Sequence, residues 1–302
     1  MKILVTGSNG LLGQKLVAQL LPRAGVELVA TSRGANKLAD LYPALRFRAL
    51  DVTDGAQVQQ VLAQERPTHV IHTAAMTNVD ECELHREACW QQNVTAVEHV
   101  VRACEEHRIH LIHLSTDFIF SGDKGPLAEE AEPGPVNFYG ESKLAAERLV
   151  QASAAPWAIA RTVLVYGVAH HYGRTNLVLW VRDALRAGTP IKVVADQWRT
   201  PTLAEDLAEG CWLLARQLAQ GIFHLSGEEI FTPYAMALRV ADHFGLDSGL
   251  IEQVDARTFA QPARRPARTG FLIGKARDTL GFRPRSFAEG IASVAAQSDA
   301  AG

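Results

Sequence analysis

The feature that most constrains the fold is a glycine-rich segment directly after the first apolar run of the chain. Lys2–Thr6 is short and apolar, as a buried strand is, and Gly7, Gly10 and Gly13 follow it at intervals of three residues. A helical pattern, Leu11–Leu21, begins inside this segment. A strand, a tight glycine turn and a helix N-terminus together present backbone N–H groups to a pyrophosphate. The segment therefore predicts a dinucleotide-binding turn, and an ordinary strand-to-helix turn is the alternative.

The rest of the first half repeats this alternation of short apolar runs and helical patterns. Further strands are expected at Glu27–Thr31, Phe47–Leu50, Val70–His72, Ile109–Leu114 and Trp157–Arg161. Helices are expected at Ala56–Gln64, Ala88–His107 and Asn137–Ala152. Several strands lack polar alternation, which is typical of strands buried on both faces. The pattern predicts the α/β class, with a Rossmann-type doubly wound parallel sheet.

After Gly167 the rhythm changes, and this change predicts a second, smaller unit. Its expected elements are a helix at Leu177–Ala187, a strand at Ile191–Val194, a helix starting near Leu203, a strand at Gly221–Leu225 and a helix at Pro233–Phe244. We therefore expect an NAD(P)-binding Rossmann domain over residues 1–167 and a smaller C-terminal α/β substrate-binding lobe over 168–302. The boundary is soft, because such a lobe can be interleaved with the sheet.

Composition excludes several functional classes. The chain of 302 residues has 30 Lys+Arg against 33 Asp+Glu, a net charge of −3, which offers no electrostatic footprint for nucleic acid. No run approaches about 18 apolar residues, so no membrane span is expected. The four cysteines form no C-x-x-C pair, which is typical of reduced thiols in a cytoplasmic protein. No ligand cluster has metal-site spacing, so no metal is expected, and the oligomeric state stays open, a homodimer included.

The end of the second strand predicts the kind of dinucleotide. NAD enzymes usually carry an acidic residue there for the ribose hydroxyls. This chain has Ser32 and Arg33 instead, and an arginine can pair with a 2′-phosphate while the serine donates a second hydrogen bond. The sequence thus favours NADP over NAD, although dual use is common at such sites. The alternative is that Arg33 is a solvated loop cation.

A hydride-transfer site is predicted by Tyr139 and Lys143, which share one face of the expected helix at a spacing of four. Thr116 ends the fifth strand at the same sheet edge, where its hydroxyl can hydrogen-bond a carbonyl oxygen. An ammonium about 4 Å from the phenol contributes roughly 4 kcal/mol at an effective dielectric of about 20. That could bring the tyrosine pKa towards about 7, suited to donating a proton as hydride arrives. The alternative is that Lys143 simply pairs with Glu147.

These arguments give a full set of expected cofactor contacts. The Asp51 carboxylate, after the third strand, would meet the adenine amino group. The small residues Ala74 and Ala75, after the fourth strand, would let the dinucleotide lie against the sheet edge. The set is Gly7, Asn9, Gly10, Leu11, Leu12, Gly13, Ser32, Arg33, Asp51, Val52, Ala74, Ala75, Tyr139 and Lys143.

Taken together, the motifs resemble the extended short-chain dehydrogenase/reductase superfamily, and within it most closely the dTDP-4-dehydrorhamnose reductase family. The matching segments run in family order: Gly7–Gly13, Ala74–Asp80, Ser115–Phe120, Tyr139–Leu144, Arg161–Gly167, Pro201–Ala208 and Arg265-Pro266. The resemblance implies NADPH-dependent reduction of the 4-keto group of a dTDP-6-deoxy-hexulose, as in dTDP-L-rhamnose biosynthesis. It implies that Thr116, Tyr139 and Lys143 carry catalysis. It also implies that Val79, Asp80, Thr116, Asp117 and Arg199 lie towards the sugar nucleotide.

Departures from the family pattern keep two alternatives open. Leu164 stands where these reductases often carry Trp, and Arg199 stands where they usually carry a small residue. One alternative is another extended-family enzyme, a 4-epimerase or 4,6-dehydratase. Phe118 occupies the place of the second acid of the dehydratases, and Arg33 disfavours the tightly held NAD of the epimerases. The other alternative is a non-catalytic NADP-binding subunit that resembles the regulatory β subunit of methionine adenosyltransferase.

A basic loop, Arg264–Arg268, has two interpretations of equal standing. It could close over the diphosphate of a nucleotide sugar, or it could be a solvated surface loop. With Arg33, Lys143 and Arg199 it predicts that a near-neutral chain conceals a positive cleft for two phosphorylated ligands.

Overall fold

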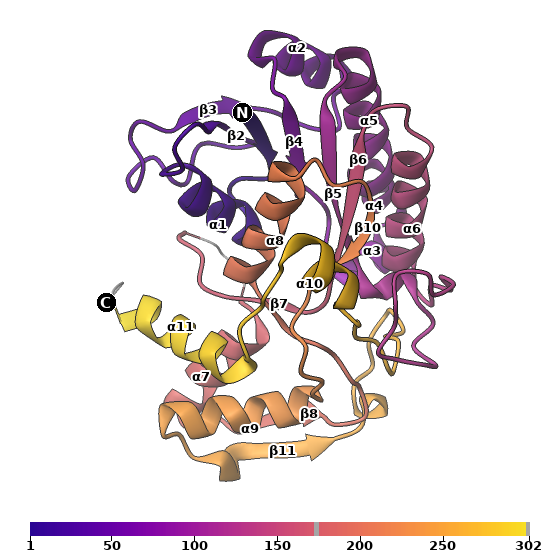
Figure 1. Ribbon diagram of the computed structural model, residues 1–302. Helices are drawn as coiled ribbons and strands as arrows, with labels where there is room; N and C mark the ends of the chain where they lie inside the picture. Colours follow the sequence, from indigo (N-terminus) through magenta and orange to yellow (C-terminus); the bar gives the residue numbers. More distant parts are fainter. Residues whose placement is uncertain (172–174, 300–302) are drawn as a thin grey trace.

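A seven-stranded parallel sheet forms the centre of the computed structural model, which describes residues 1–171 and 175–299 (Figure 1). The strand order is β10-β6-β5-β4-β1-β2-β3, so the chain runs outward from β1 in both directions. The strands are β1 (Lys2–Thr6), β2 (Glu27–Ser32), β3 (Arg46–Ala49), β4 (His69–His72), β5 (His110–Thr116), β6 (Trp157–Thr162) and β10 (Gly221–His224). Strands β2 and β3 are added on one side of β1, and β4, β5, β6 and β10 are added on the other. This arrangement makes the sheet doubly wound, which confirms the predicted fold class.

Helices cover both faces of this sheet (Figure 1). One face carries α1 (Leu11–Leu20) and α8 (Ala204–Arg216), which pack on each other. The opposite face carries α2 (Gly55–Glu65), α5 (Ala96–His107) and α6 (Phe138–Gln151). Both faces of the central strands are therefore buried, which explains why these strands appear in the sequence as uninterrupted apolar runs.

A smaller lobe with its own apolar core lies at the carboxyl edge of the sheet (Figure 1). It comprises α7 (Leu177–Arg186), α9 (Pro233–Phe244), α11 (Phe287–Asp299) and a parallel pair of strands, β8 (Ile191–Val194) and β11 (Ile251–Val254). Three later elements, the strand β10 and the helices α8 and α10 (Gly274–Leu280), pack in the body built around the sheet and not in this lobe. A further short pair, β7 (Val165–Tyr166) with β9 (Thr202–Leu203), lies where the chain passes between the two bodies. The two bodies are therefore interleaved along the chain beyond residue 167.

The structure differs from the expected helix at Ala88–His107. The segment contains α4 (Arg86–Trp90), a π-helical turn (Gln91–Thr95) and then α5. The turn brings Asn93 to the Met76 backbone, where its side chain makes hydrogen bonds of 2.8 and 3.0 Å. Several elements lie outside the predicted ones: α3 (Val79–Leu84), which Asn78 caps, α10 (Gly274–Leu280), α11, β11 and the 3₁₀ turns Asp117–Ile119, Ser248–Leu250 and Ala256–Thr258.

The four cysteines are free thiols, and all four are buried. Among the described residues no helix is long and apolar enough to cross a membrane.

Candidate active site

A cavity of about 1070 Å³ opens at the carboxyl ends of the strands, between the sheet and the lobe. This is the general ligand position in open parallel sheets. Every expected cofactor contact lines it, from the glycine turn through Ser32 and Arg33 to Tyr139 and Lys143. Lys37, which sequence analysis missed, lines it as well. Lys37 could have been found only by knowing how the loop after β2 folds, because Asn9 Oδ1 accepts from its backbone N–H at 3.0 Å.

The glycine turn forms a backbone cradle at one end of the cavity. Gly7 has a φ of +68°, which few other residues adopt, and a Cβ there would lie 2.9 Å from the Thr73 hydroxyl. A Cβ on Gly13 would lie 2.3 Å from the Gly7 carbonyl oxygen, so helix and turn are in close contact. Helix α1 starts after Gly10 with no side-chain cap. Its first N–H groups are therefore available to an anion, and the residues present fit the pyrophosphate of a dinucleotide.

The other end of the cavity carries the predicted catalytic side chains. Tyr139 and Lys143 project from the first turns of α6, and Thr116 ends β5. Asn137 fixes the start of α6, since its side chain accepts from the Gly140 N–H at 2.9 Å. A Cβ on Gly140 would lie 2.1 Å from the Phe118 carbonyl oxygen, so α6 packs tightly against the chain that follows β5. Three chemically distinct groups therefore meet at the sheet edge.

The pKa of Tyr139 differs from the sequence expectation. Burial raises the pKa of this phenol above its usual value, and a hydrogen bond with the Thr116 side chain opposes that rise. Burial also lowers the pKa of Lys143 to about 8. The Lys143 ammonium lies 2.6 Å from the Leu114 carbonyl oxygen, to which it donates. The expected lowering of the Tyr139 pKa is therefore wrong, because burial of the phenol has the largest effect on it.

The alternative pairing of Lys143 with Glu147 does not form either. Arg161 binds both oxygens of the Glu147 carboxylate, at 2.9 Å from Nε and 2.8 Å from the terminal nitrogen. Both side chains are almost fully buried. The bidentate pair links α6 to β6 and leaves Lys143 facing the cavity.

Asn93 is a site residue that sequence analysis missed. Its side chain donates 3.0 Å hydrogen bonds to the Met76 carbonyl and to the Ser142 hydroxyl, and its Oδ1 accepts from the Met76 N–H. It thereby ties the chain after β4 to α6, between Tyr139 and Lys143. The only sequence signal was an asparagine on the apolar face of the expected helix, four residues from both Cys89 and Val97.

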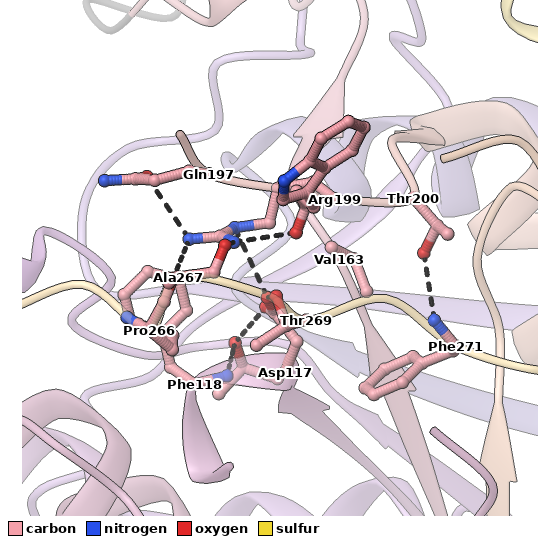
Figure 2. A network of polar contacts seen from close by, with 12 residues as sticks. Asp117, Phe118, Val163, Gln197, Arg199, Thr200, Pro266, Ala267, Thr269 and Phe271 are labelled. Carbon is pink, nitrogen blue, oxygen red and sulfur yellow. Dashed lines mark hydrogen bonds and ion pairs between the residues drawn. The ribbon is translucent and has the colours of Figure 1, made fainter. Parts of the chain in front are cut away.

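Arg199 and Asp117 form a buried network beside the cavity (Figure 2). The Arg199 Nε lies 3.7 Å from an Asp117 carboxylate oxygen, and Thr269 donates to the same carboxylate. The Arg199 guanidinium also donates to the backbone carbonyls of Trp198, Ala267 and Pro266, at 2.8, 3.3 and 2.7 Å, and to the Gln197 side chain at 3.3 Å. Both Asp117 and Arg199 line the cavity, but the polar capacity of Arg199 is largely used to hold this loop.

The basic loop is docked at Arg265 and exposed to solvent at Arg264 and Arg268. Arg265 lines the cavity and binds both oxygens of Asp80 at 2.6 Å, while the Ala263 N–H donates to Asp80 at 3.1 Å. Asp80 itself does not line the cavity, although Val79 beside it does. Arg264 and Arg268 are exposed. Of the loop's arginines, Arg265 is therefore the one that reaches the cavity in the described part of the chain.

One group of possible metal ligands occurs within residues 1–171 and 175–299. Asp40, His170 and His171 each offer a ligand atom, and these atoms lie within 4.8 Å of one another. Sequence spacing could not reveal this group, since its members are far apart in the chain. None of its side chains lines the cavity.

Comparisons with known proteins identify the family. The family model described as RmlD substrate binding domain matches residues 1–300. A dTDP-4-keto-6-deoxy-D-glucose reductase of Streptomyces niveus is 34% identical over 269 residues, 88% of this chain and 86% of that protein. The chain therefore belongs to the RmlD substrate binding domain family, within the extended short-chain dehydrogenase/reductase superfamily. The resemblance inferred from the motifs is confirmed.

Solved structures agree with this assignment. A dTDP-4-dehydrorhamnose reductase of Bacillus anthracis in complex with NADP is 28% identical, with a TM-score of 0.85 over 98% of this chain and 99% of that one. A UDP-glucose 4-epimerase of Thermus thermophilus in complex with NAD is 25% identical, with a TM-score of 0.85 over 100% of both chains. The fold is thus one that binds a nicotinamide dinucleotide.

Proposed function

We propose that this member of the RmlD substrate binding domain family is an NADPH-dependent reductase of the 4-keto group of a nucleotide-activated 6-deoxy sugar. The reaction is that of dTDP-4-dehydrorhamnose reductases in dTDP-L-rhamnose formation. One observation carries the proposal: a single cavity joins a backbone phosphate cradle to Tyr139, Lys143 and Thr116. The free thiols of all four cysteines support a cytoplasmic setting.

The residues around the cavity fit NADPH. The cradle of Gly7, Gly10 and Gly13 would hold the pyrophosphate at the start of α1. After β2 the cavity is lined by Ser32, Arg33 and Lys37, which include two cations and no carboxylate. Such a set favours a 2′-phosphate over free ribose hydroxyls. When bound, the cofactor supplies the hydride.

The catalytic end would supply the proton. Burial keeps the Tyr139 phenol protonated before substrate arrives, so the proton needed at the new hydroxyl oxygen is in place. The Thr116 hydroxyl, which lines the cavity with that phenol, would hold the carbonyl oxygen beside it. The Lys143 ammonium would hold the ribose next to the nicotinamide and stabilise the phenolate left after proton transfer.

The sugar nucleotide would occupy the side of the cavity lined by Val79, Asp117 and Arg265. Arg265 is the guanidinium best placed for a diphosphate, because it is partly exposed and held by the Asp80 carboxylate. In this assignment Asp80 and Arg199 act on the substrate through the loop that they hold. Phe118, where the dehydratases place a second acid, argues against water elimination from the sugar.

The deciding assay mixes the protein with NADPH and dTDP-4-keto-6-deoxy sugars of both C5 configurations and follows the loss of NADPH absorbance. Tyr139→Phe should abolish turnover while NADPH still binds. Tyr234→Phe, a matched change on α9 outside the cavity lining, should leave turnover intact. Tight NADPH binding with no turnover of any nucleotide keto-sugar would refute the proposal and favour a non-catalytic NADP-binding subunit.

A further inference from the structure

Two buried histidines, His72 and His113, lie near Lys143, and the proposed reaction gives them no part. Lys143 Nζ is 3.3 Å from His113 Nε2 on β5, in addition to its 2.6 Å hydrogen bond to the Leu114 carbonyl. An ammonium has three N–H donors, and these two contacts take two of them. The third remains for a ligand in the cavity, which Lys143 lines.

His113 can act here only as a neutral acceptor. Burial holds its pKa well below the usual range, and the nearby Lys143 ammonium lowers it further. Lys143 has only donors to offer, so the lone pair of His113 must be on Nε2 and its proton on Nδ1. That Nδ1 is buried and has no hydrogen-bond partner among the described residues.

His72 on β4 braces this ring. The two imidazoles are stacked, with centroids 5.6 Å apart and planes inclined by 17°. The Thr6 hydroxyl accepts from the backbone N–H groups of Thr73 and Ala74 at 3.1 and 3.3 Å, so its own proton goes to His72 Nδ1, 2.9 Å away. Burial lowers the pKa of His72 to about 3. Both rings are therefore uncharged, each in a single tautomer.

We propose that His113 is a positioning residue: its neutral Nε2 and the Leu114 carbonyl together fix the Lys143 ammonium at the cavity wall, and His72 holds His113 in place. The inference rests on the proposed function only in giving Lys143 a part in ketone reduction. The contact itself exists whatever the substrate.

The hydrogen bond from Lys143 to the neutral His113 ring should affect the pKa of Lys143. The titratable groups around Lys143 are His113 from β5, His72 from β4, Tyr139 and Glu147 from α6, Cys82 from α3, Cys89 from α4 and, paired with Glu147, Arg161 from β6. Burial lowers the pKa of Lys143 to about 8, and Glu147 opposes this only from a distance. The hydrogen bond to His113 stabilises the ammonium without adding a full negative charge. Removing that acceptor should therefore lower the Lys143 pKa further.

The test compares His113→Phe, which keeps a ring against His72 but removes the acceptor, with His113→Gln, which restores an acceptor near the position of Nε2. The titration of Lys143 is followed by NMR of ¹³Cε-labelled lysine, with Lys143→Arg to assign the signal. In His113→Phe we expect the Lys143 pKa to fall by about one unit, the size of a lost hydrogen bond to a charged group. The pKa of the alkaline limb of the kcat profile should fall by the same amount. In His113→Gln the Lys143 pKa should return most of the way to its native value.

A matched control is available on the same strands. His110 on β5 contacts His69 on β4 edge-on, at 5.4 Å, and its Nε2 contacts the Ala219 carbonyl oxygen at 2.9 Å, away from Lys143. His110→Phe should lower stability without moving the Lys143 titration. An unchanged Lys143 pKa in folded His113→Phe would overturn the inference.

Two further outcomes are decisive. Should His113→Phe fail to fold, ¹⁵N NMR of the native protein settles the tautomer, and a proton on His113 Nε2 would overturn the inference. A shifted Lys143 titration in a protein that reduces no nucleotide keto-sugar would leave the inference standing and refute the proposed function.

Discussion

Removal of the Arg33 guanidinium should weaken NADPH binding much more than NADH binding. Arg33 is exposed and lines the cavity just after β2, beside Ser32 and near Lys37. A hydrogen bond to a charged group contributes about 1.5–3 kcal/mol, and solvent exposure puts Arg33 near the lower end of that range. A loss of about 1.5–2 kcal/mol corresponds to a Kd for NADPH raised roughly 10- to 30-fold.

The assay is fluorescence titration of NADPH and NADH, each against the native protein and Arg33→Ala. The Kd for NADH should change less than about threefold, because its ribose offers no phosphate to the guanidinium. Arg239→Ala, an exposed arginine on α9 outside the cavity lining, controls for loss of surface charge. Equal changes for the two cofactors, or no change for NADPH, would refute the assignment of the 2′-phosphate to Arg33.

Three other perturbations test the fold and the cradle. Gly13→Ala should abolish dinucleotide binding, because the new Cβ would lie 2.3 Å from the Gly7 carbonyl oxygen; isothermal titration checks it, and unchanged NADPH affinity would contradict it. Glu147→Gln should lower the free energy of unfolding by about 3–5 kcal/mol, because it leaves the buried Arg161 charge uncompensated. Urea unfolding measures this loss, and a loss below about 1 kcal/mol would contradict the prediction. Acid should destabilise the protein, because burial lowers the pKa of His69 to about 4 and of His72 to about 3, so that below pH about 6.5 the unfolded chain binds more protons. Thermal unfolding should therefore show a Tm that falls as the pH drops from about 6.5 towards 4, and a flat Tm over that range would contradict the linkage.

Local patterns in the sequence were enough to predict the sheet, the glycine turn and the shared face of Tyr139 and Lys143. Each of these depends on residues within one or two turns of chain. The spacing of Lys143 and Glu147 also allowed a pair within the helix, and only the tertiary contact with Arg161 on β6 decided against it.

Features that depend on distant contacts could not be predicted. The π-helical turn exists where the Asn93 side chain meets the Met76 backbone, and no local periodicity encodes that meeting. The ion pair of Asp80 with Arg265 joins residues 185 apart. The Tyr139 pKa depends on how completely the phenol is buried, which the spacing to Lys143 does not reveal.

The central claim is hydride delivery from a bound nicotinamide to a sugar carbonyl, and one measurement tests it most directly. NADPH deuterated at the transferable position is incubated with the protein and dTDP-4-keto-6-deoxy sugar, and the product is examined by NMR and mass spectrometry. We predict one deuterium at C4 of the sugar for each NADPH consumed, and none with Tyr139→Phe. Product formed without net NADPH consumption, or without deuterium at C4, would contradict the account.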